Sequence, residues 1–196
     1  PPEQHPRLVQ LQSVVRRSLA QSASRLKSIL ARIGRFTNLD RAEIVTVSVN
    51  DLLSDVAGMM ESQVRDGVKL ELDLNDVPPL TCRPQQLSAA FFNVISNAAT
   101  AIDGEGMVRV ATRPVDSSVL VVIADNGRGM SASQVEEVFQ PDFRDVEGRI
   151  KSANWGMFSS RQIVREHGGE IRIASTEGKG TTVTITLPVA VDLNRD

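Results

Sequence analysis

Residues 121–130 read VVIADNGRGM and carry the strongest structural signal of the chain. An apolar run, typical of a buried strand, ends abruptly in Asp125 and a Gly-x-Gly turn. Glycine adopts backbone shapes that other residues resist, so Gly127 and Gly129 predict a tight loop. A carboxylate fixed at a strand end can accept a hydrogen bond from an amino group, such as that of adenine. The alternative is that Asp125 only caps the strand.

A helix is predicted over residues 85–102, QQLSAAFFNVISNAATAI, because its apolar residues recur at helical spacing. Asn93 and Asn97 are four residues apart and therefore share one helix face. Amides inside an apolar helix need polar partners, which a metal ion with phosphate oxygens would supply. Hydrogen bonds that pack the helix against its neighbours are the alternative.

Two further segments follow in order. One is VFQPDF at 138–143, and the other runs from Trp155-Gly156-Met157 through a helix to His167 and on to EGKGTT at 177–182. Together the four segments resemble the N, G1, F and G2 boxes of sensor histidine kinases, from about residue 8 to Pro188. The resemblance implies an α/β sandwich of the Bergerat (GHKL) type, as in gyrase, Hsp90 and MutL.

The resemblance also implies a site for ATP and Mg²⁺. Asp125 would accept from the adenine amine, and the loop glycines would let the backbone approach the base. Asn97 would give its amide oxygen to Mg²⁺, which prefers oxygen ligands, and Asn93 would contact phosphate or a metal-bound water. The expected nucleotide-binding residues are Asn93, Asn97, Asp125, Gly127, Gly129, Met130, Phe139, Gly156, Met157 and Thr181.

Two of these residues have simpler alternatives. Thr181 would support Asp125 or the purine through its hydroxyl, unless it is an ordinary strand residue. Gly156 would begin a helix whose N-terminal amides face the phosphates, unless it only starts that helix.

The identity of residue 93 distinguishes ATP hydrolysis from phosphoryl transfer to a histidine. ATP hydrolases of the wider superfamily carry a glutamate one turn before the magnesium asparagine, and that carboxylate acts as a general base on water. An amide cannot take up a proton. We therefore expect a two-component sensor histidine kinase, in which phosphoryl transfer depends on positioning and charge neutralisation, with relay to a response regulator receiver domain.

The chain departs from the family in three places. The G2 box Gly-x-Gly-Leu-Gly-Leu becomes SANWGM at 152–157, which keeps only the last glycine and predicts weaker ATP binding or a different lid. In the F box, Asp142 replaces an aromatic residue and RDV at 144–146 replaces Thr-Thr-Lys. Residues 140–156 lack regular periodicity and are predicted to form a flexible lid.

The third departure concerns the phosphoacceptor histidine, which the family carries before an acidic residue and, one turn later, a proline. His5 is followed by Pro-Arg-Leu, and His167 fits the family's structural helix end. We therefore expect the acceptor to lie outside this chain, as in a fragment that begins after the first bundle helix or a divergent member that lacks it.

The chain divides near residue 40. Residues 6–37 predict one long helix with a coiled-coil-like apolar stripe, and a stripe of this kind needs a partner. We expect residues 1–40 to be part of a dimerisation helix that makes a homodimer, with a core helix of the same domain as the alternative. Residues 45–190 would form the catalytic ATP-binding domain.

The remaining pattern predicts about five strands and three helices, in a mixed sheet with helices on one face. The predicted helices are 51–66, 85–102 and one from 156 to 167. The predicted extended segments are 45–49, 69–74, 80–83, 107–112, 119–124, 170–175 and 181–187.

Composition limits the function classes. The net charge is −2, which gives no reason to expect nucleic acid binding. No apolar run is long enough for a membrane span, and Cys82 is the single cysteine, so we expect a cytoplasmic protein without membrane contact by these residues. Membrane anchoring of a longer protein stays open.

Two alternatives to a kinase are kept. The altered G2 box favours a pseudokinase or histidine-phosphotransfer scaffold that acts by protein binding. A serine kinase or anti-sigma-type protein of the same superfamily is the other, and the long N-terminal helix argues against it.

Overall fold

The computed structural model describes residues 43–61, 63–145 and 150–190. These residues all belong to one compact unit, which begins at Ala42. The predicted dimerisation helix and His5 lie outside the described residues.

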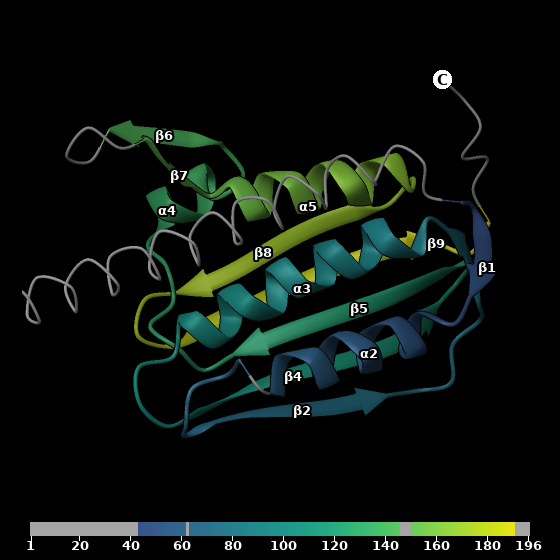
Figure 1. The fold of residues 1–196 in the computed structure, drawn as a ribbon, viewed down its shortest axis with the longest axis horizontal. Coiled ribbons are helices and arrows are strands. Elements are labelled where there is room, and N and C mark those ends of the chain that lie inside the picture. The colour runs from purple at the N-terminus through teal and green to yellow at the C-terminus, as the bar shows by residue number, and fades with distance from the viewer. Residues whose placement is uncertain (1–42, 62, 146–149, 191–196) are drawn as a thin grey trace, which may run out of the picture. The chain divides into compact units, whose positions relative to one another are not determined.

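The core of the unit is a five-stranded sheet with the order β2-β4-β5-β9-β8 (Figure 1). β2 pairs parallel with β4, and the other neighbours are antiparallel, so the sheet is mixed as predicted. Both predicted hairpins, β4–β5 and β8–β9, are present. The strands are β2 (Val68–Leu74), β4 (Gly106–Val115), β5 (Ser118–Asp125), β8 (Glu170–Thr176) and β9 (Gly180–Pro188).

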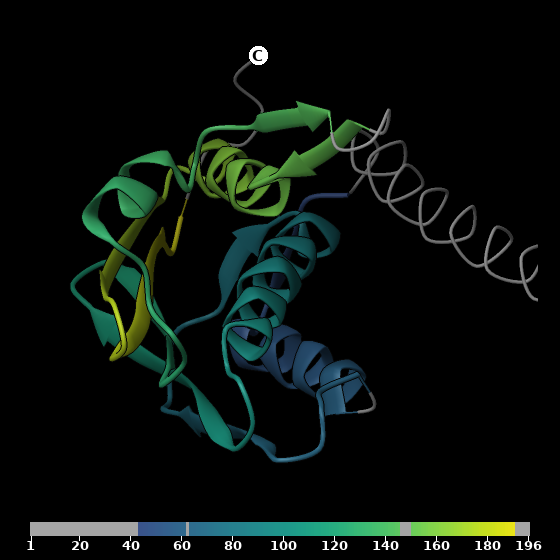
Figure 2. The same cartoon turned by 90° about the vertical axis from the view of Figure 1, so that its left-hand side faces the viewer.

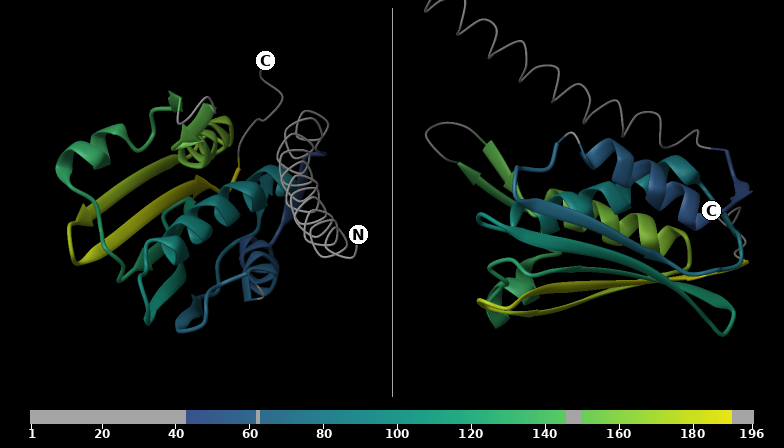
Figure 3. Two further views of the ribbon diagram at one scale, coloured as in Figure 1. Left: turned by 60° about the vertical axis from the view of Figure 1, so that its left-hand side comes forward. Right: turned by 90° about the horizontal axis from the view of Figure 1, so that it is seen from below.

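Three helices, α2 (Val49–Glu61), α3 (Pro84–Thr100) and α5 (Trp155–Glu166), cover one face of this sheet (Figures 2 and 3). Alternation places every second residue of β5 toward the helices, and Val121 and Ile123 are buried there. Phe91 and Ile95 of α3 lie in the same core. The expected α/β sandwich is confirmed. Among the described helices, none is long and apolar enough to cross a membrane.

Two predicted extended segments do not join the main sheet. β1 (Val45–Val47) pairs antiparallel with β3 (Leu80–Cys82) in a separate two-stranded sheet. The prediction that these segments are extended is confirmed. Their pairing with each other depends on tertiary contacts that periodicity does not reveal.

A short helix, α4 (Ala132–Glu137), was not predicted from the apolar pattern. It begins with a capping box, in which the Ser131 hydroxyl accepts from the Gln134 amide and the Gln134 side chain accepts from the Ser131 amide. Ser-x-x-Gln is a recognised start signal for a helix. α4 has no fully buried residue, so it lacks the apolar stripe that reveals longer helices.

The expectation of a lid without regular structure is wrong in part. β6 (Asp142–Asp145) pairs antiparallel with β7 (Ile150–Ala153) and forms a hairpin that leads into α5 (Figure 1). Four-residue strands give too few alternations to be recognised in a sequence.

Candidate functional site

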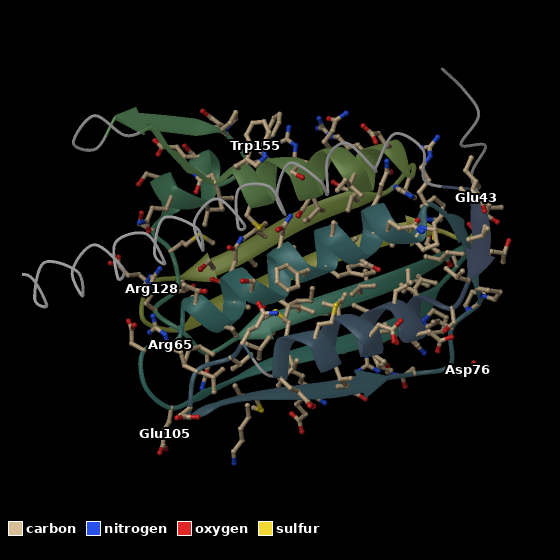
Figure 4. The ribbon with its side chains drawn as sticks, in the orientation of Figure 1. Glu43, Arg65, Asp76, Glu105, Arg128 and Trp155 are labelled. Carbon is tan, nitrogen blue, oxygen red and sulfur yellow. The ribbon has the colours of Figure 1, made fainter. Side chains whose placement is uncertain are left out.

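Asp125 is the last residue of β5, at the end of the sheet where α3 also ends and α5 begins. Figure 4 shows Arg128 at this end of the fold and Trp155 near the start of α5. Asp125 pairs directly with Thr181 across the β5–β9 ladder. The strand pattern therefore brings two of the predicted nucleotide contacts side by side.

The Asp125 carboxylate is half-buried and held by backbone groups. The Gly127 amide donates a 2.9 Å hydrogen bond to Oδ1. Burial raises the pKa of the Asp125 carboxyl above its ordinary value, and this effect outweighs the opposing hydrogen bonds from the Gly127 and Thr181 amides and the charge of Arg128. A carboxylate that is partly desolvated makes a stronger hydrogen bond to a ligand than one in water.

The two loop glycines are required by the protein itself. A Cβ on Gly127 would clash with the Ala101 carbonyl at the end of α3, and a Cβ on Gly129 would clash with the Thr176 carbonyl at the end of β8. Gly129 also has φ of 65°, which disfavours other residues. The Gly-x-Gly loop thus passes closely between α3 and the β8–β9 hairpin. This close packing requires both glycines, in addition to the predicted approach of the backbone to a base.

Hydrogen bonds fix this loop in place. The Arg128 amide donates to the Ala101 carbonyl (2.9 Å), and the Arg128 carbonyl accepts from the Gly178 amide (2.7 Å). The Met130 amide donates to the Ser175 hydroxyl at 2.8 Å. The loop after β5 is therefore attached both to α3 and to the hairpin.

The Thr181 hydroxyl does not reach Asp125 directly but lies 2.9 Å from the Ser175 hydroxyl. Thr181 supports Asp125 through its backbone amide, whose hydrogen bond lowers the carboxyl pKa. The Thr181 hydroxyl thus belongs to a network with Ser175 and not with Asp125, while its expected contact with the purine stays a prediction.

A cavity of about 640 Å³ opens beside these residues. Asp125, Ser175 and Thr181 border it from the sheet, and α4 borders it with Ala132 and Val135. A volume of this size falls in the range of small-molecule sites.

Asn93 and Asn97 lie at the end of α3 that faces the site, but neither amide is buried in the core. Asn97 is exposed, and Asn93 is half-buried. Asn93 Nδ2 donates a long, 3.4 Å hydrogen bond to the Gly156 carbonyl, so it contributes to the contact between α3 and α5. The argument that buried amides demand a metal is therefore wrong for both residues, although their shared helix face is confirmed.

The start of α5 keeps the left-handed backbone conformation that a glycine would adopt, although the G2 box has lost two of its glycines. Asn154, which aligns with a missing glycine, has φ of 63° and ψ of 2° and precedes the first helical residue, Trp155. Asn is among the few residues that tolerate this left-handed conformation. The change in sequence thus preserves the local turn, and it no longer favours the scaffold alternative.

The other predicted residues lie around the same helix. Met157 is buried in the core, and Phe139 packs against its edge. The Arg161 guanidinium lies 5.3 Å from the centre of the Phe139 ring, a cation–π contact between α5 and the segment after α4.

The donor set limits the kind of metal site. Within the described residues, no group of three or more His, Cys, Asp or Glu side chains could hold a metal ion. An exposed asparagine oxygen can coordinate Mg²⁺, which usually has few protein ligands and is also coordinated by phosphate oxygens and water. The described residues are therefore compatible with a magnesium nucleotide.

A family model described as "Histidine kinase-, DNA gyrase B-, and HSP90-like ATPase" matches residues 82–191, which is more than half of the chain. The chain belongs to this family. The match spans the helix that carries Asn93 and Asn97, the Gly-x-Gly loop and the β8–β9 hairpin.

Similar proteins include sporulation kinase E of Bacillus subtilis, 32% identical over 172 residues, covering 85% of this chain and 23% of that protein. The sensor histidine kinase ZraS of Escherichia coli K12 is 27% identical, covering 88% of this chain and 37% of that protein. The chain therefore spans less than two fifths of these relatives. The fold of full-length ShkA in complex with AMPPNP matches with a TM-score of 0.72 at 20% identity, covering 89% of this chain and 38% of that one.

Two residues of this site were not predicted from the sequence. Ser175 occupies an ordinary strand position, and only the register of β8 with β9 brings its hydroxyl to Thr181. Asn154 was counted as a lost glycine, although asparagine at a turn before a helix is a recognisable signal for a positive φ.

Proposed function

We propose that residues 45–190 bind ATP at the end of β5, with the adenine amine donating to the Asp125 carboxylate. The observation that carries this proposal is Asp125 facing Thr181 at the edge of the 640 Å³ cavity. Desolvation strengthens the hydrogen bond that the carboxylate accepts. The family assignment supports the same ligand.

The phosphates would lie between α3 and the start of α5. The first amides of a helix attract anions, and Gly156 and Met157 lie in the first turn of α5. Asn97 would give its oxygen to Mg²⁺, and Asn93 would contact a phosphate or a metal-bound water. The metal would neutralise charge on the phosphates.

The reaction we propose is transfer of the γ-phosphoryl group of ATP to a histidine, as in a protein histidine kinase. Asn93 stands where a hydrolase of the wider superfamily would carry a general base, and an amide cannot take that role. The similar proteins are named as kinases. His167 is buried with both ring nitrogens in hydrogen bonds, so the acceptor we propose is a histidine outside this chain.

Two partners follow from this role. We propose a response regulator receiver domain as the recipient of the phosphoryl group, and a homodimer formed through the apolar stripe within residues 6–37. A cytoplasmic location fits both partners. The support is the resemblance of the sequence motifs and the named relatives.

Calorimetric titration of ATP with Mg²⁺ into the chain tests the proposal, with Asp125→Asn as the key variant. The carboxamide oxygen can still accept from the Gly127 amide, while its NH₂ group would face the adenine amine. We expect affinity to fall roughly tenfold to hundredfold, which is the loss of one charge-assisted hydrogen bond.

Asp76→Asn makes the same change of charge at an exposed position, at the opposite end of the fold from Arg128 (Figure 4), and should leave affinity unchanged. A folded wild-type chain that binds no ATP, or an Asp125→Asn variant with wild-type affinity, would overturn the proposed site.

A further inference from the structure

Ser175, the penultimate residue of β8, joins three parts of the site through one hydroxyl. Its Oγ lies 2.8 Å from the Met130 amide nitrogen, 3.0 Å from the Gly180 carbonyl oxygen and 2.9 Å from the Thr181 hydroxyl. The three partners come from the loop after β5, the start of β9 and the edge of the cavity.

The directions of these hydrogen bonds follow from what each group can do. An amide N–H only donates, so Ser175 accepts from Met130. A carbonyl only accepts, so the single hydroxyl proton of Ser175 goes to Gly180. The contact with Thr181 is then a hydrogen bond only if the Thr181 hydroxyl is the donor.

This assignment sets the character of Thr181 at the cavity. With its proton directed to Ser175, the Thr181 oxygen presents only lone pairs to a ligand. Directly opposite residues on antiparallel strands have Cβ atoms about 5 Å apart, and Thr181 is opposite Asp125. The cavity edge therefore carries two hydrogen-bond acceptors side by side.

Two neighbouring acceptors distinguish between purines. A 6-amino purine has two N–H donors on one nitrogen and can satisfy both acceptors. A 6-oxo purine places a carbonyl oxygen in the same position, where it would leave polar groups unpaired, and such unpaired groups carry most of the discrimination in binding sites.

We propose that Ser175 is a positioning residue that holds Thr181 as an acceptor and so favours 6-amino over 6-oxo purine nucleotides. The proposal rests on the proposed ATP site. Ser175 would act by orienting the Thr181 hydroxyl and would not itself contact the base.

The test compares the affinities of ATP and inosine triphosphate, each with Mg²⁺, by calorimetry on the whole chain. In Ser175→Ala the Thr181 hydroxyl loses its acceptor and can turn its proton toward the cavity. We expect the ratio of ATP affinity to inosine triphosphate affinity to narrow about threefold to tenfold, the range for one hydrogen bond. If Ser175 only stabilised the fold, its loss would lower the affinities for both nucleotides equally and leave their ratio unchanged.

Two controls define the result. Ser175→Thr keeps a hydroxyl and should keep the wild-type ratio of the two affinities. Thr184→Ala removes a hydroxyl from the other face of β9 and should also leave this ratio unchanged. If Ser175→Ala does not fold, Ser175→Cys has nearly the shape of serine, but its sulfur is a much weaker acceptor for the Thr181 hydroxyl, so it should give the same narrowing.

If the wild-type chain binds ATP and Ser175→Ala leaves the ratio of ATP affinity to inosine triphosphate affinity unchanged, only the proposed role of Ser175 is overturned. Failure of the folded wild-type chain to bind ATP overturns the proposed function, and the selectivity role with it.

Discussion

The backbone amide of Arg83 donates a 3.0 Å hydrogen bond to Nε2 of His167, which joins the start of α3 to the end of α5. The other ring nitrogen, Nδ1, lies 2.7 Å from the Ile163 carbonyl oxygen. Because the amide only donates and the carbonyl only accepts, the imidazole is neutral with its proton on Nδ1. A residue remote from the cavity thus holds together the two helices that carry Asn93 and Gly156.

This arrangement predicts a loss of stability in mild acid. Burial lowers the pKa of His167 below its ordinary value of 6.5, against the opposing effect of the Ile163 carbonyl. As pH falls through 6.5 the unfolded chain binds a proton before the folded one, so the contribution of His167 is complete above pH 6.5 and decreases below it. Urea denaturation at pH 7.5, 6.5 and 5.5 should show a decrease of up to about 1.4 kcal/mol per pH unit below 6.5.

Two variants assign this slope to one residue. His167→Gln keeps a donor and an acceptor but cannot titrate, so the slope between pH 6.5 and 5.5 should largely disappear. His5→Gln leaves His167 as the one histidine of the sequence and should keep the slope. A slope that persists in His167→Gln would show that other groups cause it.

A second prediction separates two glycines of the site. A Cβ on Gly127 would clash with the Ala101 carbonyl, whereas a Cβ on Gly156 would lie 3.5 Å from the nearest atom of Asn93, an ordinary contact. We expect Gly127→Ala to lower the free energy of unfolding by about 1–3 kcal/mol. Gly156→Ala should be neutral or slightly stabilising, because alanine favours a helix over glycine by roughly 0.5–1 kcal/mol. Equal losses in urea denaturation would contradict the close approach at Gly127.

Long periodic segments could be predicted from the sequence. The alternation along β5 and β9 and the helical spacing of α3 extend over enough residues to define the sheet and its covered face. The link between Asp125 and Thr181 comes from the family resemblance, since their direct pairing depends on the register of β5 with β9.

Features that depend on register or on short elements could not be predicted. The contact of the Ser175 hydroxyl with Thr181 depends on which residues of β8 and β9 are opposite one another. No local sequence pattern predicts this register. The β6–β7 hairpin is too short for a periodic signal. Asn97 was expected to need a polar partner because it lies in an apolar helix, but it is exposed while Ala98 and Ala99 beside it are buried, so its face of the helix points away from the core.

Asn154 carries a third prediction. In a left-handed conformation a residue with a Cβ costs about 1–2 kcal/mol relative to glycine, and asparagine partly offsets this with local hydrogen bonds. Asn154 Nδ2 donates a 3.3 Å hydrogen bond to the Glu137 carbonyl. We expect Asn154→Ala to be about 1 kcal/mol less stable than Asn154→Gly in urea denaturation. The reverse order would contradict a cost of the left-handed backbone conformation at residue 154, because neither variant keeps the hydrogen bond to Glu137.

The magnesium role of Asn97 gives the last prediction. Because its amide is exposed at the end of α3 beside the proposed phosphate position, Asn97→Ala removes the oxygen proposed for Mg²⁺ without a cavity in the core. Calorimetric titration of ATP with and without Mg²⁺ should show that this variant loses most of the affinity gained from the metal, while its affinity without metal stays near that of the wild type. Thr100→Ala, another exposed change less than one turn further along α3, should keep the full magnesium effect. An Asn97→Ala variant that still gains as much from Mg²⁺ as the wild type would exclude Asn97 as a ligand and would direct the search for the metal oxygen to the other groups near the phosphates, with Asn93 first.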